Sequence, residues 1–296
     1  LGHMAKTFAN SIKELDESNL IGLSSRSYLK LLKFSYRFNI SWKNLYRNYD
    51  EILLNKDIEN IYIGTLNNSH YDLIIKCIAA QKNILCEKPF VLNYKQALNI
   101  KNKLSNSKNF FLEGIAYRSH PQTKKIIDLL RNDYIGDVLT IKSSFGFNAG
   151  KPKTGERLFD EKFGGGAILD LGCYPISMAN LIANHKNNDE IIPKISNISG
   201  VICETGVETS AKARLSYSNG IVSEISVSIS ENLDNQTIIS GSKGMIKITD
   251  PWLPKKEGFI EVHKNSKIEK LKFKCNLSLF ANQIKLFNES TLNKEH

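Results

Sequence analysis

Asn83-Ile84-Leu85-Cys86-Glu87-Lys88-Pro89 is the stretch that decides the predicted fold. An apolar run, residues 83–86, ends abruptly in two opposite charges and a proline, which cannot continue a central strand. In an open parallel sheet the ligand crevice lies outside the carboxyl ends of the strands. Lys88 is therefore the first catalytic candidate. The alternative is a solvated Glu87–Lys88 ion pair at a strand end.

Strands and helices are predicted to alternate on both sides of this stretch. Apolar runs indicate buried strands at Leu20–Ser24, Asn60–Gly64 and Phe110–Gly114. Helical patterns lie between them, for example over Ser27–Phe38 and Asn93–Leu104. This alternation predicts an α/β domain over residues 1–115, with a doubly wound parallel sheet of the Rossmann type.

A different pattern follows this domain. A predicted helix begins at Pro121 and is followed by a long strand, Val138–Phe147. Alternating runs flank Ser218-Asn219-Gly220, and two further runs are joined by residues 241–244. Such pairs of runs predict β-hairpins. Residues 116–296 are therefore predicted to form an α+β domain with a large, mainly antiparallel sheet, which binds substrate and mediates oligomerisation.

The first residues predict a helix start that can hold a phosphate. Leu1-Gly2-His3-Met4-Ala5 would read G-x-G-x-x-A if one glycine preceded Leu1, and helix N-termini bind phosphates through their backbone N–H groups. A Rossmann unit needs a strand before this helix. The sequence therefore predicts a fragment that lacks its first strand and first glycine.

Ser25 and Arg26 lie about twenty residues after Gly2, where a dinucleotide fold places the side chain that reads the ribose. NAD-preferring sites have Asp or Glu there, whereas a guanidinium pairs with a 2'-phosphate. This predicts a preference for NADP(H) over NAD(H). The alternative is that Ser25 caps the following helix and Arg26 is solvated.

A second group of candidates lies in Gly164-Gly165-Gly166-Ala167-Ile168-Leu169-Asp170-Leu171-Gly172-Cys173-Tyr174. Three glycines allow the backbone to approach a ligand closely, and on a helix Asp170 and Tyr174 share one face. A tyrosine hydroxyl has an ordinary pKa near 10, so proton transfer at neutral pH requires a nearby cation, for which Lys88 is the candidate. The alternative is a glycine-rich helix start with Asp170 as a structural acceptor and Tyr174 half-buried.

Composition restricts the class of protein. The 296 residues are 41% hydrophobic and 24% charged, without an apolar run of eighteen residues or a recognisable leader, so we expect a cytoplasmic protein and no membrane span. Five cysteines without a C-x-x-C pair and six scattered histidines predict no disulfide framework and no metal. The net charge of +10 is spread along the chain, which makes a nucleic-acid partner a distant alternative.

Together, these motifs resemble the Gfo/Idh/MocA oxidoreductases, the family of glucose-fructose oxidoreductase and inositol dehydrogenase. The resemblance rests on six stretches: 1–5, Ser25-Arg26, residues 65–70, Glu87-Lys88-Pro89, 113–118 and 164–174. A tyrosine rather than a histidine at Tyr174 is similar to the branch of glucose-fructose oxidoreductase and dimeric dihydrodiol dehydrogenase, which prefers NADP. Three departures are Leu66 in place of the proline of T-P-N, the absent first strand, and an end at 279–296 before the usual last helix.

The resemblance implies roles for individual residues. Lys88 would touch the substrate and the nicotinamide ribose, Tyr174 would donate or accept the proton, and Asp170 would orient the substrate. The remaining implied contacts are Gly2 and Met4 at the pyrophosphate, Ser25 and Arg26 at the 2'-phosphate, Thr65, Asn67 and His70 at the middle of the cofactor, Glu87 and Pro89 along the crevice, and Arg118 and Arg157 at cofactor or substrate.

The predicted function is reversible hydride transfer between NADP(H) and a carbinol or ketone carbon of a sugar-like substrate, with Tyr174 moving the proton and Lys88 lowering its pKa. The sequence does not identify the substrate. The alternative is a non-catalytic dinucleotide-binding protein or an inactive truncated fragment of such an enzyme. The resemblance also implies a homo-oligomer, a dimer or tetramer, formed through the sheet of the second domain.

Overall fold

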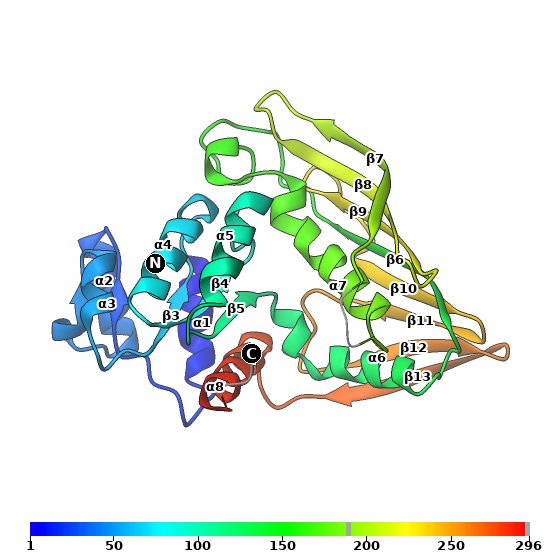
Figure 1. The fold of residues 1–296 in the computed structure, drawn as a ribbon, viewed down its shortest axis with the longest axis horizontal. Coiled ribbons are helices and arrows are strands. Elements are labelled where there is room, and N and C mark those ends of the chain that lie inside the picture. The colour runs from blue at the N-terminus through cyan, green and yellow to red at the C-terminus, as the bar shows by residue number, and fades with distance from the viewer. Residues whose placement is uncertain (188–190, 294–296) are drawn as a thin grey trace. The chain divides into compact units, whose positions relative to one another are not determined.

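The structure, a computed structural model, describes residues 1–187 and 191–293, which divide into two compact units (Figure 1). Unit 1 contains Leu1–Gly114 and the segment from Phe280 onward, and unit 2 contains Ile115–Leu279. The sequence prediction placed the segment from Phe280 in the second domain and assigned no helix to it. In the structure Leu279–Asn293 form helix α8, whose Asn288 donates a hydrogen bond to Ser18 (2.6 Å) within unit 1.

Unit 1 confirms the predicted α/β class with parallel strands. The strands form two sets, β1 beside β2 and β3-β4-β5, and all pairs are parallel. Helices alternate with them along the chain, and Ile74, Ile84 and Ile100 form part of the core between α4, β4 and α5. The elements are α1 (His3–Ile12), β1 (Leu23–Ser24), α2 (Tyr28–Phe38), β2 (Leu45–Tyr46), α3 (Tyr49–Leu54), β3 (Asn60–Ile63), α4 (His70–Ala79), β4 (Asn83–Glu87), α5 (Tyr94–Leu104), β5 (Phe111–Gly114) and α8.

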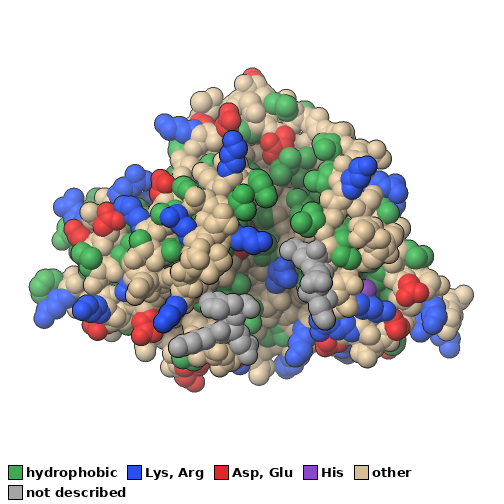
Figure 2. All heavy atoms as spheres, in the orientation of Figure 1, with side chains coloured by type: hydrophobic (Ala, Val, Ile, Leu, Met, Phe, Trp, Pro, Cys, Tyr) green, Lys and Arg blue, Asp and Glu red, His purple; other side chains and the backbone are tan. Residues whose placement is uncertain are grey.

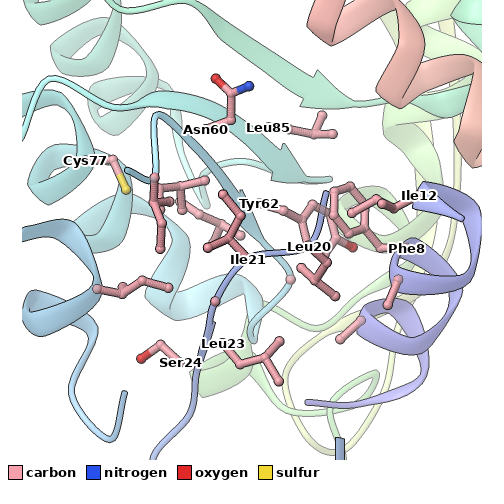
Figure 3. Close-up of a pocket in the computed structure, with 18 of the residues that line it drawn as sticks. Phe8, Ile12, Leu20, Ile21, Leu23, Ser24, Asn60, Tyr62, Cys77 and Leu85 are labelled. Atoms are coloured by element: carbon pink, nitrogen blue, oxygen red, sulfur yellow. The ribbon is translucent and has the colours of Figure 1, made fainter. Parts of the chain in front are cut away.

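A cavity of about 810 Å³ separates the two sets of strands in unit 1 (Figure 3). Its lining includes β1 and β3, together with apolar side chains of α1 and α8 such as Phe8 and Phe287. Leu20–Gly22 also line the cavity, and the Ile21 carbonyl accepts a hydrogen bond from the Asn44 side chain (3.1 Å). Strand β1 covers only Leu23–Ser24 and is therefore shorter than the predicted strand over 20–24.

Unit 2 contains one sheet of eight strands in the order β13-β12-β11-β10-β6-β9-β8-β7. The two predicted hairpins are confirmed as β8–β9 and β10–β11, and Gly220 in the first turn has a φ of +87°, which glycine adopts without strain. The sheet is mixed because β6 and β9 pair in parallel. The strands are β6 (Val138–Gly146), β7 (Lys194–Ile202), β8 (Glu208–Ser216), β9 (Val222–Ser228), β10 (Gln236–Gly241), β11 (Gly244–Thr249), β12 (Glu257–Lys264) and β13 (Lys267–Lys274).

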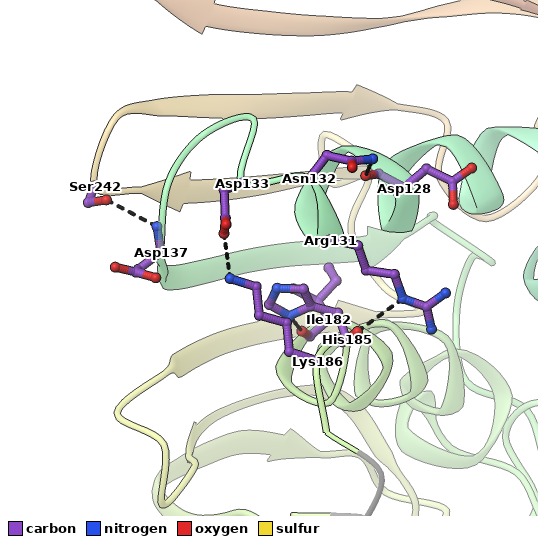
Figure 4. A network of polar contacts seen from close by, with 9 residues as sticks. All are labelled: Asp128, Arg131, Asn132, Asp133, Asp137, Ile182, His185, Lys186 and Ser242. Carbon is purple, nitrogen blue, oxygen red and sulfur yellow. Dashed lines mark hydrogen bonds and ion pairs between the residues drawn. The ribbon is translucent and has the colours of Figure 1, made fainter.

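Helices α6 (Pro121–Arg131) and α7 (Cys173–Ala183) pack on one face of this sheet (Figure 1). Polar contacts join their carboxyl-terminal ends: Lys186 pairs with Asp133, and Arg131 donates to the carbonyl of His185 (3.1 Å) (Figure 4). The stretch Glu161–Ala183 is long and apolar enough to cross a membrane, but 67% of its most apolar window is buried. Its packing against β6 and β9 is that of a core element.

The basic residues do not form a single patch on the face drawn in Figure 2. Lysine and arginine side chains are spread over that face and acidic side chains lie among them. The lysines are likewise spread along the sequence.

Candidate active site

Lys88 follows the central strand of the three-stranded sheet in unit 1. Strand β4 pairs with β3 and β5 on its two sides, and its residues 84–87 are buried. The strand ends at Glu87, and the Lys88–Pro89 peptide bond is cis. Lys88 itself is half-buried. The alternative of a solvated Glu87–Lys88 ion pair does not hold for Glu87, which is only 8% exposed.

The Glu87 carboxylate is held inside the sheet. The Tyr62 hydroxyl, on β3, donates to its Oε1 at 2.8 Å, and the backbone N–H of Lys88 also donates to it. Burial raises the pKa of Glu87, while the Tyr62 hydrogen bond and the Lys88 charge oppose this rise. Glu87 therefore anchors the turn from which the Lys88 side chain extends.

Two further side chains hold the residues after Lys88. The buried imidazole of His70, at the start of α4, lies 2.9 Å through Nδ1 from the carbonyl of Pro89 and 3.3 Å through Nε2 from the carbonyl of Thr65. On the other side, Oε1 of Glu113 accepts a hydrogen bond from the backbone N–H of Phe90 (3.2 Å). His70 thus ties together the loops that follow β3 and β4, and its predicted contact with the cofactor stays a prediction.

We expect His70 to make the stability of the protein pH-dependent. Burial lowers its pKa below the ordinary value near 6.5. Below about pH 6.5 the imidazole of the unfolded chain binds a proton, whereas that of the folded chain stays neutral until the pH reaches its lowered pKa. The unfolding free energy therefore decreases as the pH falls from about 6.5 toward the pKa of His70 in the folded protein. A His70→Leu variant leaves a buried carbonyl unpaired and should cost about 1–3 kcal/mol of unfolding free energy above that pH.

The measurement is urea unfolding of the parent protein and His70→Leu at several pH values. The difference in unfolding free energy between the parent protein and His70→Leu should become smaller as pH falls below about 6.5, because only the parent must keep this imidazole neutral. His3→Leu, at an exposed histidine, is the control and should leave the profile unchanged. A gap that stays constant or widens toward acid pH would contradict the assignment.

Four of the residues predicted to hold the cofactor lie at the start of α1 and in the segment that leads into α2. Gly2 is the N-cap of α1, and Met4 lies in its first turn. Ser25 is buried and its Oγ accepts a hydrogen bond from the backbone N–H of Ser27 (3.2 Å), the N-cap of α2. Arg26 is exposed. Ser25 therefore shapes the turn into α2, and the cofactor roles of these residues stay predictions.

The loop after β3 carries Thr65 and Asn67. Asn67 is buried and begins a short 3₁₀ turn, residues 67–69, that leads into α4. The Ser69 hydroxyl lies 2.7 Å from Thr65 Oγ1 and 2.8 Å from the carbonyl of Leu66, to which it donates. Side-chain contacts thus hold this loop, although Leu66 stands where the family has proline.

In unit 2 the last glycine of the triple glycine, Gly166, lies close to the side chain of Glu208. Gly166 has a φ of +104°, and a Cβ there would lie 2.4 Å from Oε1 of Glu208. The same oxygen accepts a hydrogen bond from the backbone N–H of Ile168 (2.8 Å). The predicted close approach of this backbone is therefore to the Glu208 carboxylate on β8, which caps the following helical segment.

Asp170 lies in a π-helical turn, Ile168–Gly172, directly before α7. The prediction assumed one regular helix; the π turn changes the angular spacing between Asp170 and Tyr174, and such turns are frequent at functional sites. Asp170 is buried, and Arg157 donates to its Oδ1 at 2.9 Å with a half-exposed guanidinium. Arg157 thus contacts Asp170, and its predicted contact with cofactor or substrate stays a prediction.

Tyr174 lies in an aromatic cluster of unit 2. Its ring is 9% exposed and packs edge-on against Phe145 and Trp252, with centroids 5.3 and 6.1 Å away. The Tyr117 hydroxyl donates to the backbone carbonyl of Tyr174 (3.4 Å). Arg118, also predicted as a contact residue, is exposed and donates to Ser177 Oγ on α7 (3.4 Å). These contacts fix the backbone and ring of Tyr174.

The sequence analysis assigned no role to Tyr62, Glu113, Glu208 or the aromatic partners of Tyr174. Tyr62 and Glu113 are polar positions near the ends of strands that flank β4, and this position could have indicated them. Across the described residues, no group of three or more His, Cys, Asp or Glu side chains could hold a metal ion.

Two family models match the chain. Residues 1–114 match the oxidoreductase family with an NAD-binding Rossmann fold, and residues 123–247 match the GFO/IDH/MocA C-terminal domain. The chain is 31% identical over 256 residues to a trans-1,2-dihydrobenzene-1,2-diol dehydrogenase of Xenopus tropicalis, a match covering 86% of this chain and 74% of that protein. The mouse (Mus musculus) protein of the same name is 30% identical over 255 residues, with the same coverage.

Solved structures share the fold. An aldose-aldose oxidoreductase of Caulobacter crescentus has a TM-score of 0.87 at 21% identity, covering 99% of this chain and 88% of that chain. A 3-ketoreductase of Actinomadura kijaniata, solved with NADP and TDP-benzene, has a TM-score of 0.83 at 21% identity, covering 97% and 86%. Together with the family matches and the similarity to the diol dehydrogenases, these findings show that the chain belongs to the Gfo/Idh/MocA family of oxidoreductases.

Proposed function

We propose that this oxidoreductase transfers a hydride between NADP(H) and a carbinol or ketone carbon of a diol, sugar or sugar derivative. The observation that carries the proposal is the Lys88 turn. The central parallel strand ends in a buried carboxylate that anchors the turn and leaves the lysine side chain half-buried at the carboxyl edge of the sheet, where ligands of such sheets bind. The names of the diol dehydrogenase relatives support this substrate class.

Two of the residues predicted to hold the cofactor support a dinucleotide as the ligand. Among the described residues, apart from the immediate chain neighbours of Gly2, no heavy atom lies within 4 Å of a Cβ built on Gly2, which suits a pyrophosphate at the first turn of α1. The exposed guanidinium of Arg26 suits a 2'-phosphate. When bound, the nicotinamide supplies or accepts the hydride.

The protein contributes the proton and the charge. In the proposed mechanism the Tyr174 hydroxyl protonates the carbonyl oxygen in reduction, or its phenolate takes the hydroxyl proton in oxidation. The Lys88 ammonium favours the phenolate and so brings proton transfer into the neutral range. Asp170, held by Arg157, orients the substrate hydroxyl.

The cofactor assignment is tested by Arg26→Ala. Loss of a charge-assisted contact with the 2'-phosphate should raise the Kd of NADPH about ten- to a hundredfold, whereas the Kd of NADH should change less than about twofold because NADH lacks this phosphate. Both constants are measured by fluorescence titration.

The matched control is Lys33→Ala, which removes an exposed positive charge from α2 and should affect the two cofactors equally and weakly. Equal losses for NADPH and NADH in Arg26→Ala, or no loss for either, would contradict the proposed preference for NADP(H).

A further inference from the structure

Tyr62 joins the Lys88 turn to the helix at which the cofactor is predicted to bind. Its hydroxyl donates to Oε1 of Glu87 at 2.8 Å. Its ring stacks on Phe8 of α1, with centroids 3.7 Å apart and planes 4° from parallel (Figure 3). One side chain therefore contacts both α1 and the residue that precedes Lys88.

The hydrogen bond from the Tyr62 hydroxyl stabilises the buried Glu87 carboxylate. A buried carboxylate that loses a hydrogen-bond donor bears the cost of desolvation, which is larger for charged than for neutral groups. Two donors to the Glu87 carboxylate are identified, the Tyr62 hydroxyl and the backbone N–H of Lys88. Without the Tyr62 hydroxyl, the backbone N–H of Lys88 is the remaining identified donor to this carboxylate. This N–H belongs to the peptide group that sets the direction of the Lys88 side chain.

We propose that Tyr62 is a positioning residue, whose hydroxyl fixes the Glu87 carboxylate and thereby the turn that carries Lys88, and whose ring ties this turn to α1. The inference rests on the proposed function, in which Lys88 acts on the substrate. Tyr62 itself takes no part in proton transfer: burial and the neighbouring carboxylate raise its pKa far above the neutral range, so the phenol stays a neutral donor.

A purely structural role for Tyr62 has a different signature. The hydrogen bond from Tyr62 lowers the pKa of Glu87. Without the hydroxyl this carboxyl group becomes protonated at higher pH, and it then no longer accepts the Lys88 N–H as a carboxylate. A positioning role therefore moves the acid limb of the kcat–pH profile to higher pH, whereas a structural role changes only the unfolding free energy.

The test is a double-mutant cycle of Tyr62→Phe and Glu87→Gln. For each variant kcat is measured against pH in the NADPH-dependent reduction of an aldose panel. NADPH affinity and urea unfolding are measured in parallel. Tyr62→Phe keeps the ring on Phe8 and removes only the hydroxyl. We expect kcat to fall about ten- to a hundredfold, with the acid limb shifted to higher pH and NADPH affinity within about twofold. The double variant should be no slower than Glu87→Gln alone, because both changes break one linkage.

Phe8→Leu is the matched control, because it removes the stacking but leaves the hydroxyl, so it should lower stability without moving the acid limb. Unchanged kcat and an unmoved limb in Tyr62→Phe, or losses that add in the double variant, would overturn the inference. Lys88→Met, assayed in the same series, separates the two claims: if it retains the turnover of the parent, the proposed role of Lys88 fails, and if the parent itself shows no turnover, the proposed function fails. If Lys88→Met is inactive and Tyr62→Phe behaves as the parent, only the role of Tyr62 fails.

Discussion

Lys88→Met is expected to lower kcat about a hundred- to a thousandfold. This is the usual loss when one preorganised positive charge that stabilises a developing negative charge is removed. Methionine has similar length and fills the same half-buried position, so the turn should remain in place. The inward contacts of the turn, from Tyr62, His70 and Glu113, do not involve the Lys88 side chain. NADPH affinity should therefore stay close to that of the parent. Because the Lys88 charge also acts on the buried Glu87 carboxylate, the unfolding free energy is measured beside turnover.

The measurement is steady-state turnover with NADPH titration by fluorescence. Lys101→Met, at an exposed lysine on α5, is the matched control and should retain full activity. Equal activity of Lys88→Met and Lys101→Met would remove Lys88 from the mechanism. A loss of NADPH binding in parallel with turnover would instead assign Lys88 to cofactor binding.

Tyr174→Phe is expected to lower kcat about a hundred- to ten-thousandfold, the usual contribution of a positioned general acid or base. The substitution removes one oxygen and keeps the ring that packs against Phe145 and Trp252. The aromatic packing should therefore stay in place, and the unfolding free energy is measured beside kcat. Because the phenol is the titrating group in the proposed mechanism, the limb of the kcat–pH profile that it controls should disappear.

A kcat–pH profile of Tyr174→Phe, compared with Tyr94→Phe as control, checks this. Tyr94 is 77% exposed on α5, and loss of its hydroxyl should leave the profile intact. A Tyr174→Phe enzyme with parental kcat, or with a reduced kcat and an unchanged profile, would exclude Tyr174 as the proton carrier.

Local sequence patterns predicted the elements that present Lys88. The apolar run 83–86, the charges after it and the alternation around it are local signals, and β4 with its neighbours β3 and β5 confirms them. The hairpin β8–β9 was likewise readable from Asn219-Gly220, because that turn type demands positive φ at its glycine. The resemblance to the family, drawn from the same motifs, is also confirmed.

Contacts between distant parts of the chain were not predictable in the same way. The Tyr62–Glu87 hydrogen bond, the His70–Pro89 contact and the capping of Ile168 by Glu208 depend on tertiary packing and leave no periodic signal. Helix α8 joins unit 1 through side chains such as Asn288, more than 250 residues after its partner Ser18. Amphipathic periodicity could have indicated a helix there but not its docking site.

Some predictions remain predictions because they concern molecules beyond one chain. The preference for NADP(H), the substrate and the homo-oligomer through the sheet of unit 2 all depend on such partners. The contacts of Arg157 and Ser25 show why a residue type alone is insufficient: each makes a hydrogen bond within the protein, to Asp170 and from Ser27. A guanidinium or hydroxyl in the sequence can serve either a ligand or the fold.

The central claim is that this protein transfers a hydride from NADPH to a carbonyl carbon, or the reverse. The most direct test incubates it with NADPH that carries deuterium at both C4 positions of the nicotinamide and with a panel of aldoses and ketones, followed by mass spectrometry of the products. The account predicts a carbinol that carries one deuterium on the former carbonyl carbon, formed by the parent protein and nearly absent with Tyr174→Phe. Products formed without deuterium would contradict the claim, whereas equal deuterium transfer by Tyr174→Phe would contradict only the role assigned to Tyr174.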